Sequence, residues 1–455
     1  MNLDDFIEEK EDNTPTKTIR ILVWPNITFS KDLTKDSYIQ VIKNMITELN
    51  KIRDDLYFYL ILPKYLECLD FPNTSQHFTE FPTYPPTMRS HFDVEWFRKW
   101  ASHDLDFDLV FSHLPEHTHQ VKNTLYNVTH HTPPVFGYCH WFDFDSITAW
   151  QCGCFNQNML GILEMDRCYI NTQAQKDLVL EQAQKTFNTD IVGKLDKILT
   201  VQHLGVKRDD IVDSSVVERP REKIIVFNHR PDTYKNYDHF VTLMRKLREV
   251  RQDFSVWVPL LNGQVPEPWF SNEKFGKEGY YKKLQECWVG FSPKQLYGGW
   301  SVSTTDGLMN GVPYIMYDAP YYHELNKTAD FFETDERALE LLNQYLNDGY
   351  RRNSAAYEGI THLNSSLIYE DEMEKMSEYI TELAGRNSTH KFSDATHKMA
   401  DFIRTNGTVS KKELFKHMNW GRGIKFTSYR KKLLTHPNIY DNMQQYPEYK
   451  WRVLK

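Results

Sequence analysis

One acidic side chain and a glycine turn lie between two apolar runs in the second half of the chain, and together they could hold a nucleotide. The stretch 291–324 passes through the turn into a helical segment at 301–310, which Gly311-Val312-Pro313 ends. Free N–H groups and the dipole at the start of such a helix bind anions. A diphosphate held there would leave the acid for the ribose hydroxyls. The candidate residues are Ser292, Gly298, Gly299, Thr304 and Asp306.

Alternating strand and helix patterns around this stretch predict the elements that must position it. Strand, helix, glycine stop and strand in succession are typical of an open parallel α/β sheet. Strands are expected at 223–227, 254–259, 289–291 and 314–317, and helices at 236–250, 338–347, 353–363 and 371–384.

The first half of the chain repeats the same alternation and predicts a second doubly wound domain. Strands are expected at 18–24, 56–62, 106–112, 134–138 and 167–171, helices at 37–52, 94–101, 115–127 and 173–186, and a long loop at 71–86. The polar stretch 207–223 is expected to link the two domains, and 385–389 is expected to link the second domain to the tail. Ligands of such sheets bind beyond the carboxyl ends of the strands, so we expect the site in a cleft between the domains.

The last 65 residues carry a charge opposite to that of the body. Residues 391–455 hold 14 Lys and Arg against 5 Asp and Glu, a net of +9, whereas the other 390 residues hold 40 against 57, a net of −17. Three short helices at 395–404, 410–418 and 427–434, then a hairpin of 438–441 with 449–453, predict a winged-helix layout that binds nucleic acid. The cations expected on it are Arg422, Lys425, Arg430, Lys431 and Lys432. The alternative is a solvated helical cap.

Two tandem α/β domains with these motifs resemble the GT-B glycosyltransferases over about 18–384. That family has an Arg and a Lys on the diphosphate after the first strand of its second domain, and Arg230 and Lys235 match them here. Fixed cations stabilise the negative charge that gathers on a leaving nucleoside diphosphate. The resemblance implies a UDP-sugar donor and no metal. Asp306 matches the second acid of the family's E-x7-E motif, whereas Gly298 stands where the first acid would hold the sugar.

The resemblance also suggests catalytic residues in the first domain. His140 and Asp143 follow the strand at 134–138, where a His lies near the sugar in many such enzymes, and either could orient or deprotonate an acceptor hydroxyl. Asp145, His113 and His203 are lesser candidates, because a single such residue is often structural. The Asp-x-Asp pairs in this half are interpreted as loop carboxylates rather than a metal site.

A sugar transferase with a basic tail resembles the DNA glycosyltransferases of T-even-like bacteriophages. The resemblance implies transfer from a UDP-sugar to 5-hydroxymethylcytosine in double-stranded phage DNA, which protects that DNA from host nucleases. The missing first acid favours a pentose such as arabinose over glucose. Two alternatives stay open: a GT-B enzyme that acts on a glycan or protein, and a non-catalytic DNA-binding protein on a transferase scaffold.

Composition and the absence of certain motifs narrow the classes of protein to which the chain could belong. Hydrophobic content of 40% fits globular cores, and no run of eighteen apolar residues predicts a membrane span. The acidic start is neither a signal nor a transit peptide, and six scattered cysteines predict a reduced, cytoplasmic chain. No Gly-x-Gly-x-x-Gly follows the first strand and no P-loop occurs, which excludes a typical dehydrogenase or P-loop ATPase. The expected parts are 1–17 (acidic tail), 18–206, 207–384 and 391–455.

Overall fold

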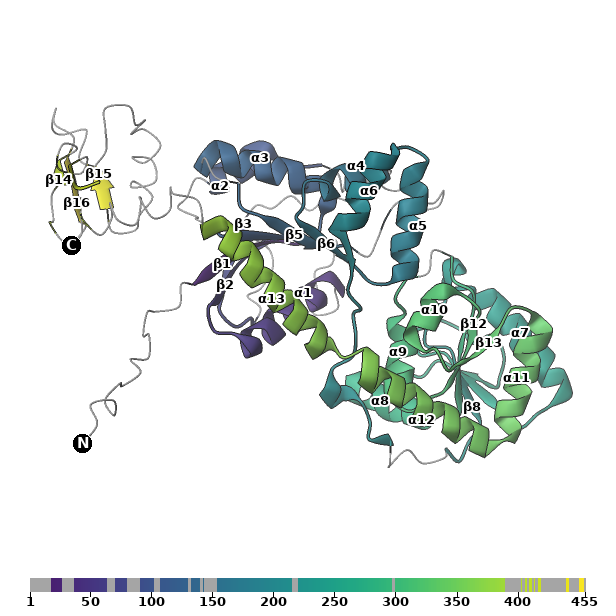
Figure 1. Ribbon diagram of the computed structural model, residues 1–455. Helices are drawn as coiled ribbons and strands as arrows, with labels where there is room; N and C mark the ends of the chain where they lie inside the picture. The colour runs from purple at the N-terminus through teal and green to yellow at the C-terminus, as the bar shows by residue number, and fades with distance from the viewer. Residues whose placement is uncertain are drawn as a thin grey trace, which may run out of the picture. The chain divides into compact units, whose positions relative to one another are not determined.

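The computed structural model describes residues 18–26, 37–63, 70–79, 91–101, 107–129, 132–139, 142, 154–214, 220–296 and 299–388, with short pieces between 402 and 453. The chain divides into two compact units. One comprises residues 1–136 and 377–455, and the other comprises residues 137–376. Two sheets with flanking helices make up most of the described residues, and a small third sheet lies in the tail (Figure 1).

The first sheet has seven strands in the order β3-β2-β1-β4-β5-β6-β7. The strands are β1 (Ile19–Trp24), β2 (Leu56–Pro63), β3 (Thr74–Thr79), β4 (Leu109–Ser112), β5 (Val135–Tyr138), β6 (Arg167–Ile170) and β7 (Leu199–Val201). Five of them fall on predicted strands, because β-branched and aromatic runs mark buried parallel strands clearly. The boundary between the two units passes through β5.

Strand β3 corrects the sequence analysis, which expected a loop at 71–86. It pairs in parallel with β2, with Phe58 opposite Thr74. Thr74, Ser75 and Gln76 are only half-buried, so this edge strand lacks the apolar run that reveals its neighbours. Its backbone pairing with β2, rather than the type of its side chains, makes it a strand.

Helices connect the strands of the first sheet. They are α1 (Ser37–Ile52), α2 (Val94–Ala101), α3 (Thr118–Thr129), α4 (Phe155–Ile162), α5 (Gln173–Gln184) and α6 (Thr189–Ile198), and a 3-10 turn, η3 (Pro115–His117), precedes α3. The predicted helix at 37–52 is confirmed residue for residue. Side chains cap two of the helices, with Thr172 accepting from Gln175 N and Asn188 from Ile191 N.

The second sheet has six parallel strands in the order β10-β9-β8-β11-β12-β13. They are β8 (Ile224–Val226), β9 (Ser255–Trp257), β10 (Phe270–Ser271), β11 (Val289–Ser292), β12 (Tyr314–Tyr317) and β13 (Asp330–Phe332). Both faces are covered, as the alternation along β8 shows. Ile225 packs into one core and Ile224 and Val226 into another.

Helices on the two faces of this sheet bury those cores (Figure 1). α7 (Tyr237–Val250) and α11 (Asp335–Asn347) contribute to one core, and α8 (Lys277–Gln285), α9 (Val302–Met309), α10 (Pro320–Leu325) and α12 (Gly349–Ser366) contribute to the other. Two further 3-10 turns are η4 (Arg208–Asp210) and η6 (Thr233–Lys235). The predicted strand, helix and strand around Asp306 are therefore confirmed as β11, α9 and β12.

Helix α13 (Tyr369–Ser388) corrects the expected linker at 385–389, because the helix continues through Ser388. Arg386 forms an ion pair with Glu382 one turn earlier, which supports the last turn. The space around a side chain at Gly385 is open, so this glycine marks no turn or close contact.

The described strands of the tail form a three-stranded antiparallel sheet in the order β14-β16-β15. β15 (Ile439–Asp441) pairs with β16 (Lys450–Val453), which confirms the predicted hairpin. β14 (Val409–Ser410) pairs with β16 through Val409 and Trp451, so Ser410 ends a strand where the expected helix at 410–418 would begin.

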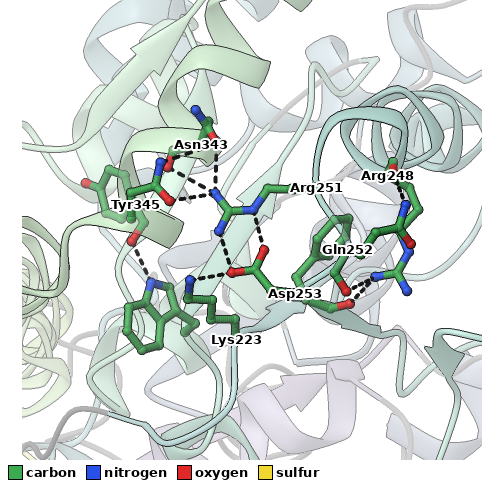
Figure 2. A network of polar contacts seen from close by, with 10 residues as sticks. Lys223, Arg248, Arg251, Gln252, Asp253, Asn343 and Tyr345 are labelled. Carbon is green, nitrogen blue, oxygen red and sulfur yellow. Dashed lines mark hydrogen bonds and ion pairs between the residues drawn. The ribbon is translucent and has the colours of Figure 1, made fainter.

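A charge network lies at the amino end of the second sheet, and Figure 2 shows it from close by. Asp253 accepts hydrogen bonds from Arg251 through both carboxylate oxygens, each at 2.8 Å, and from Lys223 Nζ at 2.6 Å. Arg251 also donates to the side chains of Asn343 and Asn347 on α11, at 2.7 and 3.1 Å. Every cation in this network has a partner, so we interpret it as a structural clamp.

A further cation at the amino end of the same sheet, Arg352, is fully buried. It donates to three backbone carbonyls, those of Trp288 at 3.1 Å, Cys287 at 3.2 Å and Gly311 at 2.8 Å. Gly311 has a φ of +75°, and it ends the turn before β12. The guanidinium therefore ties α12 to the starts of β11 and β12.

Four cysteines fall in the described residues, Cys139, Cys154, Cys168 and Cys287, and all are buried free thiols. Burial raises the pKa of Cys168 to about 12, so it remains a thiol. Among the helices of the described part, none is both long and apolar enough to cross a membrane.

Candidate nucleotide-binding site

The candidate site lies at the point where the strand order of the second sheet reverses. From β8 the chain continues to β9 on one side, and β11 lies on the other side, so β8 and β11 flank this switch point. Open α/β sheets bind ligands beyond the carboxyl ends of such strands. The chain after β8 carries His229, Arg230 and Lys235, and β11 ends at Ser292. The fold therefore brings together two sequence motifs that lie about 60 residues apart.

A chain of buried hydroxyl groups crosses the switch point and holds the start of α9. His229 Nε2 lies 3.1 Å from Ser292 Oγ, which lies 2.8 Å from Thr304 Oγ1. Thr304 Oγ1 lies 2.8 Å from the Oγ of Ser301, the N-cap of the helix. All four residues are buried. Ser292 and Thr304 therefore fix the N-terminus of α9 from within the protein.

His229 is a site residue that the sequence analysis missed. Burial, and then the nearby Lys235 charge, lower its pKa well below the ordinary value, so it is a neutral ring. A neutral imidazole nitrogen can either donate to or accept from the Ser292 hydroxyl. Its position directly before Arg230 was the available signal, but a lone histidine after a strand is not specific.

Lys235 ends the 3-10 turn η6 and is partly buried. Its Nζ donates to Gln295 Oε1, and it lies 5.0 Å from the centre of the Tyr234 ring. Desolvation, and then the Arg230 charge, lower the pKa of Lys235 to about 8. Within the described part of the chain it forms no ion pair with a carboxylate. An amide rather than a carboxylate holds this partly buried ammonium. Its positive charge is therefore not neutralised within the site and can bind an anion.

Arg230 is the outer of the two cations. Its side chain is 67% exposed, and its Nε lies 3.5 Å from Asp232 Oδ2. It also donates to the Tyr234 hydroxyl, and its guanidinium lies 5.6 Å from the centre of that ring. Tyr234 thus lies against both Arg230 and Lys235. The two cations share one aromatic support at the carboxyl end of β8.

Asp306 lies in the second turn of α9, where the sequence predicted it. Desolvation raises the pKa of Asp306 to about 7, although a hydrogen bond from Tyr280, 3.4 Å away, and the Lys277 charge lower it. Asn228 joins this acid to β8, because its Nδ2 donates to the Tyr280 hydroxyl at 2.9 Å. Neighbouring residues 228 and 229 therefore connect β8 to α9 by two separate networks.

The glycine turn before α9 is described in part. Gly298 lies outside the described residues. A Cβ added at Gly299 would lie 3.2 Å from Gln175 Oε1 on α5, so the turn passes close to that helix. A side chain at position 299 would therefore press on Gln175, which would have to shift by a few tenths of an ångström.

The two predicted catalytic residues, His140 and Asp143, lie outside the described residues, as does Asp145. His113 is buried at the end of β4, and its ring lies at the edge of Phe111 and of Tyr38, with centroids 5.1 and 5.9 Å apart. The predicted nucleic-acid contacts in the tail also fall outside the described part. These assignments stay predictions.

His203 makes a contact that the sequence analysis did not foresee. Its Nε2 lies 3.3 Å from Glu324 Oε2, and its ring lies 5.4 Å from that of Trp300. Glu324 also accepts hydrogen bonds from the backbone N–H groups of Gln173 and Ala174, both at 2.8 Å. Those N–H groups open helix α5, so a carboxylate from α10 occupies its N-terminus. No motif in the sequence indicated this pairing.

In the described residues, no group of three or more His, Cys, Asp or Glu side chains is placed to hold a metal ion.

No known family model matches the chain, and no curated protein matches it by sequence. Solved structures do match. An α,α-trehalose 6-phosphate synthase from Burkholderia multivorans has a TM-score of 0.58 at 11% identity, over 82% of this chain and 98% of that one. HepE from Anabaena, solved in complex with UDP, has a TM-score of 0.54 at 10% identity, over 80% and 100%.

A third structure, solved from E. coli as trehalose-6-phosphate bound with UDP-2-fluoro glucose, has a TM-score of 0.55 at 10% identity, over 81% of this chain and 99% of that one. These matches each cover about four-fifths of this chain, and their low identities bear on the fold alone. This chain has the GT-B fold of these glycosyltransferases.

Proposed function

We propose that the chain is a glycosyltransferase that takes its sugar from a UDP-sugar. The single observation that carries this proposal is the Lys235 ammonium, which lies at the switch point with an amide partner and no carboxylate partner in the described part. Arg230 and Lys235 bind the diphosphate together with the N-terminus of α9, and Asp306 accepts hydrogen bonds from the ribose. The UDP ligands of two structures with the same fold support this donor class.

The chemistry follows from charge. As the bond from the anomeric carbon to the diphosphate oxygen breaks, negative charge gathers on the leaving UDP. Fixed cations in a partly desolvated site stabilise that charge more than they stabilise the bound donor, which lowers the barrier. The new bond joins the anomeric carbon to the acceptor oxygen, and the acceptor proton passes to a base, for which His140 or Asp143 is proposed.

The sugar itself is proposed from the position of Gly298. An acid at this position would hold sugar hydroxyls, and glycine has no side chain that could do so. We therefore propose a sugar other than glucose, such as the pentose arabinose, with glucose as the alternative. Ser292 and Thr304 act on the donor indirectly, because both are buried and hold the start of α9.

The acceptor is proposed from the charge of the tail. Residues 391–455 carry a net charge of +9 on an acidic chain, and polyanions bind such surfaces. We propose double-stranded DNA that contains 5-hydroxymethylcytosine, with Arg422, Lys425, Arg430, Lys431 and Lys432 on its phosphates. The target base would leave the stack so that its hydroxymethyl oxygen reaches the donor.

The test is to incubate the full chain with hydroxymethylated DNA and a panel of UDP-sugars, and then to weigh the released nucleosides. The expected result is one mass increase that matches a transferred pentose or hexose and is strongly reduced in Lys235→Met. If no donor adds mass although UDP binds, the DNA acceptor is wrong, and glycans and proteins become the acceptors to examine. If UDP itself does not bind, the transferase proposal fails and the scaffold alternative stands.

A further inference from the structure

The loop after β11, residues 293–296, lies between the cation site and helix α10. On the cation side two backbone groups of the loop are held. Leu296 N donates to Tyr234 O at 3.0 Å, and Asn236 Nδ2 donates to Lys294 O at 2.7 Å. The loop and η6 therefore form one hydrogen-bonded unit.

On its other side the loop is held by two consecutive tyrosines of α10. Gln295 N donates to the Tyr321 hydroxyl at 3.0 Å, and Gln295 Nε2 donates to the Tyr322 hydroxyl at 2.5 Å. Tyr322 in turn donates to Pro293 O at 3.1 Å. This order of donors fixes the Gln295 amide, because its Nε2 faces Tyr322 and its Oε1 faces Lys235.

The far end of α10 is held on α5. Glu324 accepts from the N–H groups of Gln173 and Ala174, and it faces His203. Burial raises the pKa of Glu324, but the hydrogen bonds from His203, Ala174 and Gln173 outweigh it and leave the pKa below the ordinary value. The ionised carboxylate is therefore the form that makes this contact. Only one residue separates Glu324 from Tyr322, and α10 has six residues, so one rigid turn joins both contacts.

We propose that α10 is a strap that positions the Lys235 ammonium, with Gln295 as the positioning residue and Glu324 as the anchor on α5. This inference rests on the proposed function, because it concerns regulation of the proposed diphosphate site. Lysine has a long, mobile side chain, so a fixed amide acceptor lowers the cost of holding its charge in place.

The strap couples donor binding to the contact between α10 and α5. If the Glu324 contact favours the arrangement in which Lys235 binds a diphosphate, then a bound diphosphate favours the Glu324 contact by the same factor. Gly299 passes close to Gln175 on the same helix, so the turn before α9 meets α5 as well. Helix α5 thus contacts the donor site at two points, through the turn and through the strap.

A double-mutant cycle tests the strap through UDP affinity, measured by calorimetry on the full chain. Tyr322→Phe removes the acceptor for Gln295 Nε2, and Glu324→Gln leaves one amide oxygen for two N–H donors. We expect each change to weaken UDP binding roughly fivefold, and the double variant to weaken it by clearly less than the product of the two. Glu340→Gln, which removes a surface carboxylate from α11, is the control and should bind UDP as the unmodified chain does.

Thermal unfolding of the same variants separates positioning from folding. A variant is used in the cycle only if it melts in one cooperative transition, as a folded chain does. If both single variants bind UDP normally, or if their effects multiply, the strap is wrong while the proposed function stands. If the unmodified chain does not bind UDP, the proposed function fails first.

Gln295→Glu supplies a second readout that does not depend on the cycle. A carboxylate beside Lys235 would raise the pKa of that lysine, so the alkaline loss of UDP binding should move to higher pH than in the unmodified chain. An unchanged midpoint would show that residue 295 does not act on Lys235 and would overturn the assignment of Gln295.

Discussion

The cations at the two ends of the second sheet have different kinds of partner. At the amino end, Arg251 and Lys223 share the Asp253 carboxylate, and Arg352 is enclosed by three carbonyl oxygens. At the carboxyl end, Lys235 rests on the Gln295 amide, and Arg230 is two-thirds exposed beside Asp232.

This difference shows how one sheet separates stability from binding. Cations at the amino end satisfy groups of the protein itself, so they hold strands and helices together. Cations at the carboxyl end lack full compensation, so they remain available for an anionic ligand. Substitutions at the first end should change unfolding, and those at the second should change donor binding.

The largest expected effect is at the amino end. Arg352→Met leaves three buried carbonyls without their donor, and each lost partner costs about 1–3 kcal/mol. We expect the free energy of unfolding to fall by roughly 4 kcal/mol in chemical denaturation. Arg351→Met is the matched control, since Arg351 pairs with the partly exposed Asp330 and should cost below about 1 kcal/mol.

Lys235→Met should produce the next largest effect, on function alone. Loss of a fixed cation from the diphosphate site should lower UDP-sugar affinity and transfer about 100-fold, with a melting temperature that is unchanged or higher. Lys223→Met at the amino end should have the opposite effect. It should lower the melting temperature and leave the affinity for the UDP-sugar unchanged. Equal affinities in the two variants would remove the distinction between the ends.

The pH dependence of donor binding should show both groups of the carboxyl end. Lys235 has its pKa lowered to about 8, so binding should weaken as pH rises through 8 and the ammonium loses its proton. Asp306 has its pKa raised to about 7, so binding should weaken as pH falls through 7 and the carboxylate gains one.

UDP-glucose is the suitable probe for this profile, because its diphosphate does not titrate in the range. The expected profile has its maximum between about 7 and 8, and each limb should change affinity several-fold. Asp306→Asn should flatten the acid limb, and Lys235→Arg the alkaline limb. A profile that both substitutions leave intact would contradict these roles.

The smallest effect should come from Asp253→Asn. Hydrogen bonds from Arg251 and then Lys223 lower the pKa of Asp253, so its stabilisation is present above pH 4 and is lost as pH falls through the folded pKa. Its side chain is 52% exposed, so the loss should stay below about 1 kcal/mol at neutral pH. A fall in donor affinity with no change in unfolding would contradict the clamp.

Most of the fold could be predicted from the sequence, because elements that pack on a core show a regular spacing of apolar residues. The helix at 37–52 and the strand, helix and strand around Asp306 follow directly from apolar spacing and the Gly-Val-Pro stop. Strand β3 and the last turn of α13 could not be predicted in this way. The first depends on backbone pairing with β2, and in the second the helix continues through Gly385 to Ser388 although glycine is a common stop signal.

The sequence by itself determined the chemical types of the candidate site: two cations after one strand, a helix start after another, and an acid within that helix. Local order fixes these features, because each lies within a few residues of a strand end. Only the tertiary structure decided their partners. His229 meets Ser292, Lys235 meets Gln295, and Glu324 meets the start of α5, across 63, 60 and about 150 residues. Such contacts arise when strands distant in sequence become neighbours, and no local pattern records which side chains then face each other.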